Sequence, residues 1–99
     1  MDIPTKPQMS ILQTGKEYKI LKVTKEKDSQ MPSHISTKEA VIIVLQGEAL
    51  LKLGGKEIQL KPNESTIIPA SEPHTLLIKE QFAANVIMAI ESEIKFVNN

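Results

Sequence analysis

Apolar and polar residues alternate along this chain in short runs that are separated by turn residues. The run 74–79 (HTLLIK) alternates with a period of two, which is typical of a strand with one buried face. Comparable short runs occur at 18–24, 49–53, 56–60, 65–68 and 82–90. Strands are favoured throughout, although 18–24 and 82–90 also fit helical spacing. Many short strands at close spacing predict an antiparallel sandwich or barrel.

The run 40–45 (AVIIVL) differs from the others because it is apolar at every position. In a strand, Ala40, Ile42 and Val44 would face the core, whereas Val41 and its alternating neighbours would face outward. An outward apolar face in so small a protein has to be covered. Cover by a partner subunit is favoured, and a homodimer is therefore predicted. A monomer in a sedimentation experiment would contradict this prediction. The alternative is that the N-terminal segment covers this face.

Glycine and proline residues mark the turns and the domain boundary. Gly54 and Gly55 separate two alternating runs, which is a strong hairpin signal because glycine readily adopts positive φ. Pro4 and Pro7 lie among polar residues and indicate an extended lead-in. The sequence thus predicts a lead-in over residues 1–15 and a single barrel domain over residues 16–99.

Composition excludes several classes of function. The 12 basic and 12 acidic side chains cancel, and aromatic residues make up only 3% of the 99 residues, so nucleic-acid binding is not expected. The absence of cysteine excludes disulfides and thiolate chemistry. No apolar run is long enough to cross a bilayer, and the N-terminus does not resemble a secretory signal. A cytoplasmic location without membrane contact is therefore predicted.

Two histidines bracket the central part of the chain and carry its candidate chemistry. His34 follows a Met-Pro pair, and His74 begins the alternating run 74–79. Strand parity turns both side chains into the barrel, together with apolar residues of neighbouring runs. The predicted ligand pocket consists of His34, Ser36, Ala40, Ile42, His74, Leu76, Ile78 and Met88.

The spacing of these residues resembles that of the small single-domain cupins, the RmlC-like jelly-roll proteins with a type-2 conserved barrel. Their first motif reads glycine, five residues, His-x-His, three or four residues, glutamate, six residues and glycine. In this chain the corresponding positions are occupied by Asp28, His34, Ser36, Ala40 and Gly47. The resemblance covers about residues 18–90 and implies an antiparallel double-stranded β-helix as a single domain.

The second motif of the same family reads glycine, five residues, Pro-x-Gly, two residues, histidine, three residues and asparagine. It falls on Asn63, Pro69, Ser71, His74 and Ile78. In metal-binding cupins, both histidines and the glutamate of the first motif join the histidine of the second in holding one divalent ion. This resemblance therefore also identifies the positions at which the present chain departs from a metal site.

Two of the four implied ligands are missing, since Ser36 replaces a histidine and Ala40 replaces the glutamate. The remaining His34 and His74 fall short of the three protein ligands that are usual at catalytic zinc and of the set used by non-haem iron. Glu39 would complete a site for zinc, iron, manganese or nickel only if a β-bulge turned it inward. No cofactor is therefore expected, and this metal site is the alternative.

Three functions are compatible with these residues. The favoured one is a cupin barrel that binds a small organic molecule without catalysis, such as a sugar or a carboxylate by family analogy. The second is a metal-dependent enzyme of the isomerase or dioxygenase kind that uses His34 and His74. The third is a metal-free enzyme in which one histidine moves a proton, a task that suits imidazole near neutral pH.

Overall fold

The structure, a computed structural model, describes residues 8–97 and consists of strands and turns. The ten strands are β1 (Gln8–Thr14), β2 (Tyr18–Lys25), β3 (His34–Ser36), β4 (Ala40–Gln46), β5 (Ala49–Leu53), β6 (Lys56–Leu60), β7 (Ser65–Ile68), β8 (His74–Ile78), β9 (Phe82–Ala89) and β10 (Ile94–Phe96). The all-β prediction is confirmed. The helical alternatives are wrong, because β2 and β9 pair along their whole length. Residues 8–97 contain no helix that could span a membrane.

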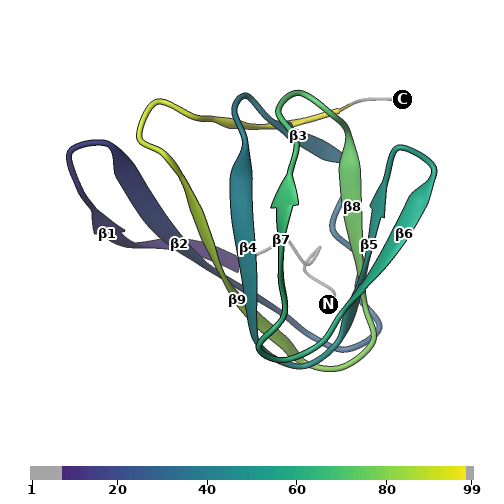
Figure 1. Ribbon diagram of the computed structural model, residues 1–99. Coiled ribbons are helices and arrows are strands. Elements are labelled where there is room, and N and C mark those ends of the chain that lie inside the picture. The colour runs from purple at the N-terminus through teal and green to yellow at the C-terminus, as the bar shows by residue number, and fades with distance from the viewer. Residues whose placement is uncertain (1–7, 98–99) are drawn as a thin grey trace, which may run out of the picture.

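The strands form two five-stranded antiparallel sheets, with the orders β1-β2-β9-β4-β7 and β10-β3-β8-β5-β6. Apart from the hairpins β1–β2 and β5–β6, each strand is followed by one in the other sheet, which is the jelly-roll arrangement. Figure 1 shows that the sheets converge at the end with the β4–β5, β6–β7 and β8–β9 connections and diverge at the opposite end. We call these the narrow end and the wide end.

Alternating side chains of both sheets meet in one core between them. In β9, every second residue from Phe82 to Met88 is buried, as strand periodicity requires. In β4, Ala40, Ile42 and Val44 are buried, as the alternation predicts. The outward residue Val41 is only half-buried. It is paired with Ile67 of β7 on one side and with Ile87 of β9 on the other, and Ile87 is in turn paired with Ile20 of β2. The homodimer that this apolar row suggests stays a prediction.

The first described strand adds an edge to the sheet rather than a cover over its outer face. Residues 8–14 of the predicted lead-in form β1, which pairs with β2 in the plane of the sheet. Ile11 and Leu12 are 62% and 53% exposed, so neither fixes the segment to the core. Residues 1–7 of the predicted lead-in lie outside the described residues.

Five connections within residues 8–97 contain residues in a left-handed backbone conformation, including the predicted hairpin turn at Gly54 and Gly55 between β5 and β6. Gly47 has a φ of 84°, and a Cβ atom there would lie 2.0 Å from the carbonyl oxygen of Gln81. Among the described residues, those other than glycine with positive φ are Asp28, Asn63 and Ser71. These three occupy the positions at which the cupin motifs carry glycine. Asp and Asn tolerate this conformation better than most residues, so the turn geometry is kept without glycine.

Candidate ligand cavity

The two histidines lie opposite each other at the wide end of the barrel. His34 is the first residue of β3 and His74 the first of β8, and the two residues are directly paired across these antiparallel strands. Both point inward and are only 5% exposed. Their ring centroids are 4.2 Å apart, with the ring planes inclined by 65°. The pairing register therefore brings together two side chains that are forty positions apart in the sequence.

The same local hydrogen bond orients each imidazole. Nδ1 of His34 lies 2.7 Å from the carbonyl oxygen of Pro32, and Nδ1 of His74 lies 3.1 Å from that of Glu72. A carbonyl oxygen can only accept a hydrogen bond, so Nδ1 carries the proton in both rings. When a ring is neutral, its Nε2 is consequently a hydrogen-bond acceptor. Each histidine donates to the carbonyl oxygen two positions before it, which belongs to Pro32 for His34 and to Glu72, the residue before Pro73, for His74.

Burial keeps both rings neutral at physiological pH. Desolvation lowers the pKa of His34 below the ordinary value for histidine, and the hydrogen bond to Pro32 only partly opposes this effect. Desolvation likewise lowers the pKa of His74, against the hydrogen bond to Glu72, and the neighbouring His34 lowers it further. The pair thus presents two uncharged imidazoles with a preference for accepting hydrogen bonds.

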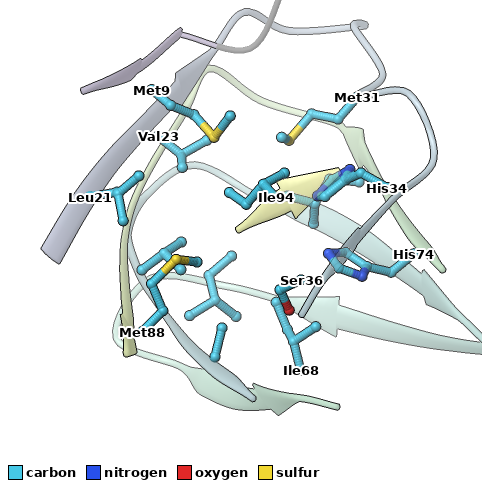
Figure 2. A pocket seen from close by; sticks show the side chains of 14 residues that line it. Met9, Leu21, Val23, Met31, His34, Ser36, Ile68, His74, Met88 and Ile94 are labelled. Atoms are coloured by element: carbon cyan, nitrogen blue, oxygen red, sulfur yellow. The ribbon is translucent and has the colours of Figure 1, made fainter. Parts of the chain in front are cut away.

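These rings form part of the wall of a cavity of about 40 Å³ between the two sheets. Figure 2 shows His34, His74 and Ser36 along one wall and Met9, Leu21 and Met88 across from them. The complete lining is Met9, Leu21, Val23, Met31, His34, Ser36, Ala40, Ile42, Ile68, His74, Leu76, Val86, Met88 and Ile94.

Most of the residues predicted for the pocket meet around this cavity. His34, Ser36, Ala40, Ile42, His74, Leu76 and Met88 all line it, whereas Ile78 is buried at the narrow end of β8. The sequence-based list lacked the side chains that arrive from elsewhere in the fold. Met9 comes from the edge strand β1, Met31 from the loop before β3 and Ile94 from β10. Only the apolar character of these residues hints at their burial.

Ser36 is the polar residue of this wall whose hydroxyl has no partner. Its side chain is buried, with 3% of the residue exposed, and its Oγ makes no hydrogen bond. Two other buried side-chain atoms in residues 8–97 share this property, Oγ1 of Thr75 and Oδ1 of Asn85, but neither residue lines the cavity. Buried polar atoms are nearly always satisfied, so an orphaned hydroxyl facing a cavity suggests an occupant.

The side chains at this end do not fit the divalent metal ion that cupins often bind. Glu39 is exposed and lines a groove on the outer side of the first sheet with Val41 and Ile67. Glu39 lies between β3 and β4, outside both strands, and the register shift in the pairing of β4 lies elsewhere, between Val44 and Gln46. Within residues 8–97, no three His, Cys, Asp or Glu side chains are grouped to share an ion. Two neutral imidazoles without a carboxylate are too few donors for such a site.

The two sheets, with a cavity between them at the wide end, define a small jelly-roll barrel. A sequence model of the cupin domain matches residues 21–90 of the 99 residues. The chain therefore belongs to the cupin domain family, and the recognition from the two motifs is confirmed. No curated protein matches the chain significantly.

Solved structures agree with this fold. A cupin superfamily protein from Desulfitobacterium hafniense superposes with a TM-score of 0.77 at 19% identity, covering 92% of this chain and 84% of that one. The DMSP lyase DddQ from Ruegeria pomeroyi superposes with a TM-score of 0.84 at 19% identity. This superposition covers 93% of this chain but only 52% of the lyase. KdgF from Halomonas superposes with a TM-score of 0.76 at 18% identity, covering 90% of this chain and 84% of KdgF.

Proposed function

We propose that this cupin binds a small, uncharged organic molecule in the cavity and does so without catalysis. The observation that carries the proposal is the character of the wall, which is apolar except for two neutral imidazoles and one hydroxyl. Ligand sites are typically concave and apolar with a few placed polar groups. A charged ligand would lose its hydration there without meeting an opposite charge.

The orientation of the histidines supports binding over acid–base catalysis. A catalytic imidazole is commonly oriented by a carboxylate, which also stabilises the protonated ring. Here backbone carbonyls of Pro32 and Glu72 hold the rings, and burial opposes their protonation. Structural neighbours include a DMSP lyase and a salicylate 1,2-dioxygenase, but identities of 19% and 12% support a shared fold only. The alternative of a metal-dependent enzyme is disfavoured, because the cavity wall offers two imidazoles and no carboxylate as metal ligands.

Methionine methyl groups provide a direct test of this proposal. Protein labelled with ¹³C at the methionine methyls would be titrated with a set of small neutral, anionic and cationic fragments. We expect saturable shifts of the Met31 and Met88 methyls with neutral fragments, because both side chains line the cavity. Assignment would use Met→Leu variants, and metal content would be measured in protein purified without chelator.

Two variants make the result specific. Ala40→Leu places extra carbon atoms in the cavity and should abolish the shifts, with Ala40→Val as the milder change if the first does not fold. Ala83→Leu adds the same atoms on the outward side of β9 and should leave binding intact. The proposal is contradicted if no fragment gives a saturable shift. It is also contradicted by stoichiometric metal that disappears in His34→Ala.

A further inference from the structure

We propose that the molecule bound in this cavity is a small aliphatic alcohol, recognised through its hydroxyl group. The hydroxyl donates a hydrogen bond to Nε2 of one histidine and accepts one from Oγ of Ser36. This inference rests on the proposed function, since it names the chemical class of the ligand at the same site. Its starting point is the set of polar atoms that the wall offers, because the remaining lining is apolar.

The polar atoms of the wall have defined hydrogen-bonding roles. Nδ1 of each imidazole is engaged with a backbone carbonyl, so each neutral ring offers only its Nε2, as an acceptor. The Ser36 hydroxyl is buried and unpartnered, and it supplies a donor. The ligand therefore needs one group that donates to nitrogen and accepts from oxygen within a short distance.

A hydroxyl group satisfies both requirements at a single oxygen atom, whereas ether, ketone, carboxylate and ammonium groups satisfy only one. An ether or ketone oxygen accepts from Ser36 but leaves Nε2 of His34 and His74 without a donor. A carboxylate also lacks a donor and carries a charge that this wall does not neutralise. An ammonium group donates to Nε2 but cannot accept from Ser36. Binding sites that hydrogen-bond a hydroxyl reject analogues that lack it, because buried polar atoms are then left unpaired.

The size of the cavity restricts the alcohol to a short chain. A volume of about 40 Å³ is well below that of the roughly 150 Å³ engineered cavity that accepts benzene. Three thioether side chains line the cavity, and methionine adapts its shape more readily than branched residues do. Met9 belongs to the edge strand β1, so its movement would enlarge the cavity with little disturbance of the core. With Met9 displaced, alcohols of up to about four carbons, which have fewer non-hydrogen atoms than benzene, are the largest that we expect to fit.

The experiment compares three probes of similar size in the methionine-labelled protein. Butan-1-ol has the required hydroxyl, its isomer methyl propyl ether has an acceptor but no donor, and propionate carries a charge. We expect the ether to bind about tenfold more weakly than butan-1-ol, since it leaves one more histidine Nε2 without a donor than the alcohol does. Propionate should give no saturable shift. Ser36→Ala should weaken butan-1-ol binding about tenfold, whereas Ser92→Ala, a buried serine outside the cavity lining, should not change it.

The possible outcomes separate this inference from the proposed function. Equal affinity for butan-1-ol and the ether, or tighter binding of propionate, would overturn the alcohol assignment while leaving a ligand-binding cavity. Binding of other neutral fragments with none of butan-1-ol would have the same meaning. If no fragment binds at all, water alone satisfies Ser36 and the imidazoles, and both proposals are wrong.

Discussion

The two ends of the barrel share strands of both sheets but differ in how completely the space between the sheets is filled. β4 contributes Val44 to the narrow end and Ala40 to the wide end, and β9 contributes Phe82 and Met88 in the same way. The narrow end is filled by large apolar side chains where the sheets converge. At the wide end the sheets diverge while Ala40 and Ser36 are small, so space remains between them. Packing at one end thus supports an incompletely filled site at the other.

The largest expected difference between the ends is in the cost of removing a core side chain. Phe82 is 1% exposed at the narrow end, and Phe82→Ala should lower the free energy of unfolding by about 3–5 kcal/mol. Met88 is also buried, with 3% of the residue exposed, but it borders the cavity, where its atoms have fewer partners. Met88→Ala should lower the free energy of unfolding by only about 2 kcal/mol, which is at the low end for substitutions of this kind. Urea denaturation measures both, and equal losses would contradict the comparison.

A smaller effect of opposite sign is expected at Ser36. Because the unpartnered Oγ loses its hydration without gaining a hydrogen bond, Ser36→Ala should stabilise the ligand-free protein by about 1 kcal/mol. The matched control is Ser92→Ala, since Oγ of that buried serine accepts a hydrogen bond from the backbone nitrogen of Lys38. The control should lose about 1 kcal/mol. Thermal denaturation measures both variants against the wild type. A lower melting temperature for Ser36→Ala than for Ser92→Ala would contradict the prediction.

The smallest effect concerns the pH dependence of stability. Burial lowers the pKa of His34 and His74 in the folded protein, whereas the unfolded chain titrates near the ordinary value of about 6.5. Between these pKa values the unfolded chain binds more protons, so stability increases with pH. The contribution is fully present above about pH 6.5 and is lost as the pH falls from there toward the folded-state pKa values.

Urea midpoints on either side of this window test the pH dependence. The wild type should be less stable at about pH 5 than at about pH 7.5. A variant with both His34→Phe and His74→Leu should show a smaller difference, because the carboxylates that titrate at low pH are present in both proteins. An identical pH dependence in the two proteins would mean that the histidines are not the groups responsible.

Strand parity and turn residues were sufficient to predict an antiparallel sandwich or barrel, because both act locally, whereas the jelly-roll topology was predicted from the resemblance to the cupin motifs. Parity also predicted that His34 and His74 face inward and that Glu39 faces away from Ala40. It could not tell which end of a strand borders a cavity, so Ile78 was grouped with residues that lie at the wide end. Met9 and Met31 reach the cavity through the placement of an edge strand and a loop. Such long-range placement leaves no periodic signal in the sequence.

The left-handed turn residues have a consequence for how relatives of this chain are recognised. Asp28, Asn63 and Ser71 adopt φ values of 62–71° where the cupin motifs have glycine. A search that demands glycine at these points rejects the chain, even though its backbone makes the same turns. A pattern written in terms of backbone conformation would admit any residue able to occupy that region. In barrels of low sequence identity, the backbone conformation of the turns therefore identifies the motif more reliably than the residue types at these positions.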